Sequence, residues 1–216
     1  MNTYGLVIFD MDGTLLDSGD AHGVMFTRFW DRYADGRPPM DPAGAPTIWD
    51  CFKPAGIAHS DMEKIYRQLD GFYHTQAEDV IRTLHFLPET RAVLQALKDA
   101  GIGTALVSNS HAALVEEIVR ENDAGELFNW ISGSTIEEED KPGRLLGVIR
   151  KAGLEPEEVL YVGDNEADGR TAHKIGIDCA IVLSPISWMR SPRTLLEEVR
   201  PTYIVYALDR ILYIAI

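Results

Sequence analysis

The chain has 216 residues, 45% of them hydrophobic, which is enough for one large domain or for a core domain with a small second one. Its formal net charge is -14, so neither nucleic acid nor an anionic membrane is an expected partner. No apolar run is long enough to span a bilayer and the first residues lack the pattern of a secretion signal, which together favour a cytoplasmic protein. Cys51 and Cys179 lie far apart in the chain and are expected to be free thiols.

Short apolar runs and amphipathic segments alternate along most of the chain. Gly101 and Gly153 each follow an amphipathic segment and are predicted to end a helix. Because predicted strands and helices alternate, we expect an α/β fold, with a Rossmann-like parallel sheet core flanked by helices. The expected strands are residues 4–9, 103–107, 128–131, 159–162, 180–183 and 203–206, and the expected helices are residues 89–100, 112–121, 143–152, 166–175 and 193–199.

One interval, residues 17–85, breaks this alternation and contains no convincing buried strand. Its aromatic and apolar residues recur at helical spacing over residues 25–33 and 62–73, which predicts helix-packing faces rather than a ligand-binding box. The stretch between them, residues 36–54, is rich in Pro and Gly and is expected to be a loop. We therefore predict a mostly α-helical insert at residues 17–85 and a core made of residues 1–16 and 86–216.

Two acidic residues leave the first predicted strand together. Asp10 and Asp12 follow the apolar residues 6–9, and Gly13 and Thr14 come next. Residues i and i+2 of a strand share a face, so the two carboxylates can be aimed at one point. Two anions that close repel each other unless a cation or a shared proton lies between them. This pair is the first indication of a metal site.

Other polar residues follow the later predicted strands. The carboxyl ends of parallel strands meet at one edge of a sheet, so these residues are expected to converge there. Carboxylates with an open coordination position suit Mg²⁺, whereas hydroxyl groups, backbone N–H groups and a lysine suit a phosphoryl group. The residues concerned are Ser108, Asn109, Ser110, Ser132, Ser134, Lys141, Asp164, Asn165 and Asp168.

With these residues in this order, the chain resembles the haloacid dehalogenase-like (HAD) hydrolase superfamily. The resemblance covers nearly the whole chain, and the insert at residues 17–85 is similar to the helical cap of the branch that holds phosphoglycolate phosphatases and β-phosphoglucomutases. The segments that carry it are Phe9-Asp10-Met11-Asp12-Gly13-Thr14, Leu106-Val107-Ser108-Asn109, Lys141-Pro142 and Val162-Gly163-Asp164-Asn165-Glu166-Ala167-Asp168.

The resemblance implies that Asp10 is the nucleophile and forms an aspartyl-phosphate, which splits one difficult displacement into two easier steps. Asp12 would be the general acid and then the base, which requires a raised pKa, and its backbone carbonyl would bind the metal. An acid at that position also favours phosphoryl transfer over dehalogenation. The alternatives are a turn or helix-cap role for Asp10 and a loop aspartate bonded to its own backbone for Asp12.

Three further residues would support the metal. The resemblance implies that Asp164 binds Mg²⁺ directly, and the alternative is that it caps the following helix. Asp168 would bind the ion through water or would orient Lys141, because residues four apart on a helix share a face. Thr14 would lie behind the ligands as an additional support.

The phosphoryl group would be held by Ser108, by the N–H group of Asn109 and by Lys141. For Ser108 the alternative is a simple N-cap before the helix at residues 112–121. For Lys141 it is a solvated lysine beside an acidic run, although Pro142 places it at a helix start.

Within the insert, the resemblance gives His22 roughly the position of a histidine that the phosphoglucomutase-like branch uses in proton transfer. A lone histidine on an apolar helical face is, however, more often packed or exposed. The polar residues of the insert that could face the site are His22, Arg28, Lys53, His59, Arg82 and His85.

These observations predict a Mg²⁺-dependent phosphatase that hydrolyses a small phosphorylated metabolite through an aspartyl-phosphate, as a HAD-type phosphoric monoester hydrolase. Two alternatives remain open: a phosphomutase of the β-phosphoglucomutase type, and a non-catalytic binding protein on the same scaffold. A monomer or a homodimer is expected.

Overall fold

The computed structural model describes residues 4–33, 59–135 and 140–216. Within them, all pairs of neighbouring strands in the sheet are parallel, in the order β3-β2-β1-β4-β5-β6, which confirms the predicted α/β fold. The strands are β1 (Leu6–Phe9), β2 (Gly103–His111), β3 (Trp130–Ser134), β4 (Val159–Gly163), β5 (Asp178–Val182) and β6 (Tyr203–Val205).

The central strand β1 is apolar at every position because both of its faces are buried. Val7 and Phe9 belong to one hydrophobic cluster, whereas Leu6 and Ile8 belong to another on the opposite face of the sheet. Alternating side chains of a strand point to opposite faces, so a strand inside a two-sided core reads as a continuous apolar run. This burial fixes the register of β1 and thereby the direction of the residues that follow it.

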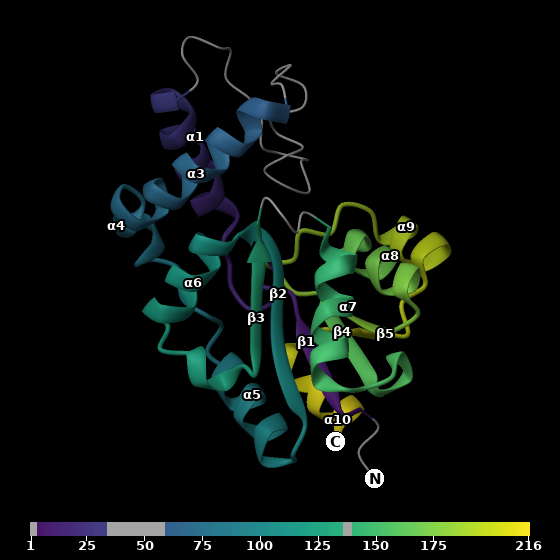
Figure 1. Cartoon of the computed structure of the whole chain (residues 1–216). Coiled ribbons are helices and arrows are strands. Elements are labelled where there is room, and N and C mark those ends of the chain that lie inside the picture. The colour runs from purple at the N-terminus through teal and green to yellow at the C-terminus, as the bar shows by residue number, and fades with distance from the viewer. Residues whose placement is uncertain (1–3, 34–58, 136–139) are drawn as a thin grey trace.

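Helices cover both faces of the sheet, as Figure 1 shows. The cluster containing Val7 and Phe9 is completed by α5 (Thr90–Asp99), α6 (Ala112–Glu121) and α10 (Leu212–Ala215). The opposite cluster is completed by α7 (Lys141–Ala152) and α8 (Glu166–Ile175). The short elements are α9 (Pro192–Thr194), η2 (Gly125–Leu127), η3 (Pro156–Glu158), η4 (Leu195–Val199) and η5 (Leu208–Ile211).

The insert between β1 and β2 contributes helices that form a cap beyond the carboxyl ends of the strands (Figure 1). They are α1 (Gly19–Tyr33), α3 (His59–Thr75) and α4 (Glu78–Ile81). The predicted packing of the aromatic faces is confirmed, since Phe29 and Phe72 meet edge to face at 5.4 Å between ring centroids and both are buried. The predicted loop at residues 36–54 lies outside the described residues, and the domain boundaries remain predictions.

Several boundaries differ from the prediction. β2 continues through the polar residues to His111, with an irregular pairing between Val107 and His111, and β3 ends at Ser134 rather than at residue 131. Polar side chains do not prevent backbone pairing, so apolar runs underestimate these two strands. α7 begins at Lys141, two residues earlier than predicted, with Pro142 in its first turn. The predicted helix at residues 193–199 is divided into α9 and the π-helical η4.

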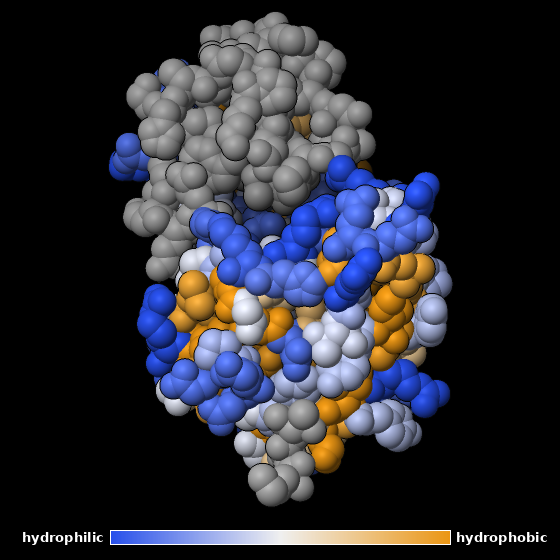
Figure 2. Space-filling view, turned by 90° about the vertical axis from the view of Figure 1, so that its right-hand side faces the viewer, coloured by the Kyte–Doolittle hydropathy of each residue, from blue (hydrophilic) through white to orange (hydrophobic). Residues whose placement is uncertain are grey.

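On the face shown in Figure 2, the surface of the core next to the cap is mainly hydrophilic, and hydrophobic residues form separate patches farther from it. None of the helices in the described ranges is long and apolar enough to cross a membrane. Cys179 is a buried free thiol, as predicted, whereas Cys51 lies outside the described residues.

Candidate active site

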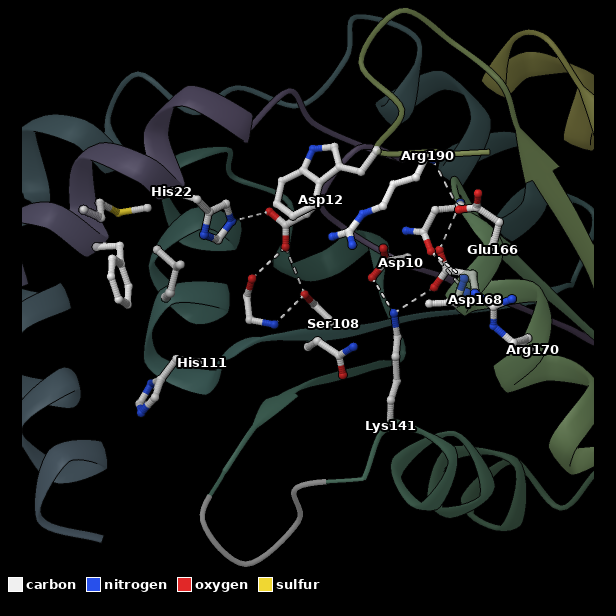
Figure 3. A pocket seen from close by; sticks show the side chains of 18 of the residues that line it. Asp10, Asp12, His22, Ser108, His111, Lys141, Glu166, Asp168, Arg170 and Arg190 are labelled. Carbon is white, nitrogen blue, oxygen red and sulfur yellow. Dashed lines mark hydrogen bonds and ion pairs between the residues drawn. The ribbon is translucent and has the colours of Figure 1, made fainter. Parts of the chain in front are cut away.

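Most of the polar residues collected from the strand ends meet at one cavity of about 350 Å³ (Figure 3), but Ser132 and Ser134 do not line it. The core lines it from the ends of β1 and β2 and from the starts of α7 and α8, while the cap lines it through α1 and α3. The predicted residues that line it are Asp10, Asp12, His22, Ser108, Asn109, Ser110, Lys141, Asn165 and Asp168. Asp164 is completely buried next to them, and Thr14 is buried with a hydroxyl that has no hydrogen-bond partner among the described residues.

Three buried carboxylates form the centre of the site. Asp10, Asp164 and Asp168 each offer an oxygen within 4.8 Å of the others. Burial, followed by the nearby charges of Asp168 and Asp12, raises the pKa of Asp10 to about 7 despite the opposing effect of Lys141. Burial, followed by Asp168 and Asp10, raises the pKa of Asp164 to about 9. If all three acids were ionised, the cluster would carry more negative charge than the surrounding groups compensate.

This donor set fits a divalent metal ion. Carboxylate oxygens are the ligands that Mg²⁺ prefers, and a bound cation would offset the burial and the repulsion that raise the pKa values of Asp10 and Asp164. Gly13 contributes to the cluster through its size, because a Cβ atom there would lie 2.3 Å from Oδ2 of Asp164. It also has a φ of +76°, a conformation that favours glycine. The Asp-x-Asp-Gly turn is thus shaped to admit the third acid.

Lys141 is the cation that lies against this cluster. Its Nζ atom is 2.8 Å from Oδ1 of Asp10 and 3.1 Å from Oδ1 of Asp168, and Tyr161 donates a 2.7 Å hydrogen bond to the same Asp168 oxygen. Burial alone would lower the pKa of Lys141, but Asp10 and Asp168 together raise it above its usual value. The alternative of a solvated surface lysine is wrong, since Lys141 is buried at the start of α7.

Asp12 is held separately by a group of hydrogen-bond donors. Ser18 Oγ and His22 Nε2 lie 2.6 and 2.8 Å from its Oδ1, and Ser110 Oγ lies 2.7 Å from its Oδ2. Ser108 Oγ also donates to Oδ2, at 3.2 Å. These contacts connect the cap helix α1 to the core, and they exclude a loop aspartate bonded only to its own backbone.

The expected raised pKa of Asp12 is not what this arrangement produces. Burial alone would raise the pKa of Asp12, but the charge of His22 and the hydrogen bonds from His22, Ser18 and Ser110 hold it below its usual range. Burial alone would lower the pKa of His22, and Asp12 raises it instead. In this geometry the proton of the pair therefore resides on His22, next to an ionised Asp12.

Two capping alternatives are also wrong. His111, not Ser108, is the N-cap of α6, since its Nδ1 accepts a hydrogen bond from the Ala113 N–H group. Asn165, not Asp164, is the N-cap of α8. The side chains of Ser108 and Asp164 therefore remain directed into the site.

Asp164 makes two contacts of its own. Its Oδ1 accepts a 2.7 Å hydrogen bond from the Asn165 side chain, and its Oδ2 accepts one from the backbone N–H of Trp188. Both contacts lower the pKa of Asp164, but burial and the neighbouring acids outweigh them.

Sequence reasoning missed several residues of the site. Arg144 donates to the backbone carbonyl of Ser108 at 2.8 Å and to Oδ1 of Asn109 at 3.1 Å, so it ties α7 to the end of β2. Its position one helical turn after Lys141 could have identified it. Trp188 and Arg190 come from the loop after β5, which ends at the same edge of the sheet.

Three of the six suggested cap residues lie elsewhere. Arg28 and Arg82 are exposed and form ion pairs with Asp79 and Glu78. His85 is exposed and does not line the cavity. Lys53 lies outside the described residues, and the side chain of His59 is not described. The cap residues that line the cavity are His22, Met25, Phe26 and Tyr73.

Comparison with known proteins identifies the family. A model described as haloacid dehalogenase-like hydrolase matches residues 7–182. Phosphoglycolate phosphatase 1 of Pseudomonas aeruginosa is 31% identical over 191 residues, which cover 81% of this chain and 68% of that protein. Pyrophosphatase PpaX of Bacillus cereus is 26% identical over 204 residues, covering 92% of this chain and 90% of that protein.

The fold comparison agrees with this. The structure of a haloacid dehalogenase-like family protein, SP0104 from Streptococcus pneumoniae, covers 99% of each chain with a TM-score of 0.75 at 19% identity, which is a likeness of fold. The match of the family model over most of the chain, together with this fold, means that the chain belongs to the haloacid dehalogenase-like hydrolases, among the phosphoglycolate phosphatase-like members.

Proposed function

We propose that the chain is a Mg²⁺-dependent phosphatase that hydrolyses a small phosphate ester through an aspartyl-phosphate on Asp10. The observation that carries this proposal is the convergence of Asp10, Asp164 and Asp168 within 4.8 Å, with Lys141 in contact with Asp10. A nucleophilic carboxylate beside two further acids and one buried ammonium group is suited to phosphoryl transfer and offers little to other hydrolytic chemistry.

In the first step, a carboxylate oxygen of Asp10 forms a bond to phosphorus while the bond from phosphorus to the leaving oxygen breaks. The leaving oxygen takes a proton from the Asp12–His22 pair, in which Asp12 is the nearer group to the reacting centre and His22 holds the proton. Lys141 offsets the charge on Asp10 and on the phosphoryl oxygens.

In the second step, water attacks phosphorus and releases Asp10 and inorganic phosphate. Asp12 accepts the proton from this water, as the reverse of its first role. Asp10 and Asp164, with the backbone carbonyl of Asp12, would hold Mg²⁺, and the ion would supply positive charge opposite the transferring phosphoryl group. Ser108 and the N–H group of Asn109 would bind phosphoryl oxygens.

The cavity volume of about 350 Å³ suits a small substrate. Met25, Phe26 and Tyr73 of the cap and Leu114 of α6 also line the cavity, so the leaving group would lie between the acids and an apolar wall. Two relatives are named phosphoglycolate phosphatase and pyrophosphatase, and the substrates in both names are small anions. A cytoplasmic location and a monomeric or homodimeric state remain predictions of the sequence.

A phosphomutase is the second candidate, and the 2.8 Å contact between His22 and Asp12 favours it. A cap histidine that donates a proton to this acid would serve transfer to a sugar hydroxyl as well as transfer to water. Release of phosphate from sugar phosphates, compared with isomerisation in the presence of a bisphosphate activator, distinguishes the two reactions.

The proposal is tested by measuring phosphate release from a panel of phosphorylated acids, sugars and nucleotides with Mg²⁺, in the wild type and in Asp10→Asn. We expect release from at least one small ester and none in the variant, whose unfolding midpoint should stay close to that of the wild type. Full activity of Asp10→Asn would refute the assigned nucleophile, and inactivity on the whole panel would favour a non-catalytic binding protein.

A further inference from the structure

The loop between β5 and α9 is attached to the acidic cluster by backbone hydrogen bonds. The N–H group of Trp188 donates to Asp164, and the N–H groups of Arg190 and Ser191 lie 3.4 and 2.5 Å from the two carboxylate oxygens of Glu166. Glu166 is itself buried in the first turn of α8. The backbone from residue 188 to residue 191 is therefore held by the same segment that supplies Asp164 and Asp168.

This attachment directs the side chain of Arg190 over the acids. Arg190 lines the cavity, and Figure 3 shows its guanidinium group extending from the loop toward Asp10 and Asp12. Among the described residues, the guanidinium group has no hydrogen bond and no carboxylate within 4.0 Å. By contrast, Arg193, three residues later, forms an ion pair with Glu197 at 2.8 Å. Arg190 is thus a cation without a protein partner at the mouth of a reaction site.

The charge of the site makes such a cation useful for substrate binding. The chain has a net charge of -14, and the cavity walls include the carboxylates of Asp10, Asp12, Glu166 and Asp168. Lys141 is already engaged by Asp10 and Asp168. A substrate with a second negative group, besides the transferring phosphoryl, would be repelled from this cavity unless a separate cation met that group. An arginine fork matches a carboxylate or a phosphate with paired N–H donors.

We infer that Arg190 is a specificity-determining residue of this site, whose guanidinium group binds a second negative group of the substrate next to the reacting phosphoryl group. The inference rests on the proposed function and assigns a role in it to one residue of the loop after β5. The competing expectation, from the apolar cap wall of Met25 and Phe26, is an uncharged leaving group for which Arg190 is irrelevant.

Phosphoglycolate and ethyl phosphate form a matched pair of probes, because they differ mainly in a carboxylate in place of a methyl group. We expect Arg190→Ala to lower kcat/KM for phosphoglycolate about 10- to 100-fold, the usual effect of losing a charge-assisted hydrogen-bond pair, and to change kcat/KM for ethyl phosphate less than about 3-fold. The control Arg193→Ala, outside the cavity, should change neither. Equal losses for both esters, or no loss for either, would overturn the inference.

A binding measurement decides the question without turnover. Calorimetric titration of Asp10→Asn with phosphoglycolate or ethyl phosphate in the presence of Mg²⁺ is repeated with Arg190→Ala added. A Kd that rises about 10- to 100-fold for phosphoglycolate alone supports the inference. An unchanged Kd, or no phosphoglycolate binding to Asp10→Asn, overturns it. If the wild type hydrolyses no ester of the panel, the proposed function fails, and this titration still tests Arg190.

Discussion

Replacing Lys141 by methionine removes the cation that lies against Asp10 and Asp168. The side chain of Lys141 is 7% exposed, and its Nζ atom contacts these acids at 2.8 and 3.1 Å, so neither water nor salt can replace it easily. Removing one partner of a buried ion pair usually costs about 3–5 kcal/mol of unfolding free energy. We expect a loss at the lower end, about 3 kcal/mol, because Asp10, with a pKa of about 7, can take up a proton in compensation.

The assay is urea unfolding in EDTA, together with phosphate release in Mg²⁺. Lys174→Met is the matched control, because Lys174 is 63% exposed and 3.3 Å from Asp140, and an exposed pair of this kind contributes about 0–1 kcal/mol. We expect kcat of Lys141→Met to fall by about 10²- to 10³-fold and that of Lys174→Met to stay unchanged. A Lys141→Met protein as stable and as active as the control would refute the claim that Lys141 compensates the charges of Asp10 and Asp168.

The remaining predictions concern the proton donor, the metal and the packing of the core. His22→Gln should lower kcat for alkyl phosphates about 10²-fold. The loss should be much smaller for p-nitrophenyl phosphate, because its leaving group needs no proton. Equal losses for both substrates would exclude an acid role for the Asp12–His22 pair. Mg²⁺ at about 100 times its Kd should raise the unfolding free energy by about 2.7 kcal/mol in the wild type but not in Asp164→Asn, and an equal rise in both would remove Asp164 from the metal site. Gly133→Ala should destabilise the fold, because a Cβ atom there would lie 2.5 Å from the backbone of Ala112. Gly143→Ala has open space around it and should stabilise α7 by about 0.5–1 kcal/mol. Urea unfolding that gives the opposite order of stability would contradict this packing.

The sheet and its acidic edge could be predicted because each depends on local sequence. The apolar run at residues 6–9 ends where the strand ends, and the period of a strand then places Asp10 and Asp12. Lys141 could be placed because Pro142 identifies a helix start at the correct edge of the sheet. The expected strand at residues 103–107 ended before the polar residues 108 to 111, although β2 continues through them.

The properties that could not be predicted depend on contacts between distant segments. The low pKa of Asp12 requires Ser110, 98 residues away, and His22 on a cap helix whose orientation is set by packing. The contact of Glu166 with residues 190 and 191 joins α8 to a loop that no local pattern singles out. Such contacts can be predicted only when the order of the strands is known, because α8 and the loop after β5 meet only if β4 and β5 are neighbours in the sheet.

The most direct test of the account is chemical trapping of the phosphorylated enzyme. During turnover of a small phosphate ester with Mg²⁺, borohydride reduces an acyl phosphate to the corresponding alcohol, and mass spectrometry locates the reduced residue. The account predicts reduction at Asp10, dependent on substrate and absent from Asp10→Asn. Steady turnover without any reduced residue at Asp10, or with reduction at another carboxylate, would contradict it.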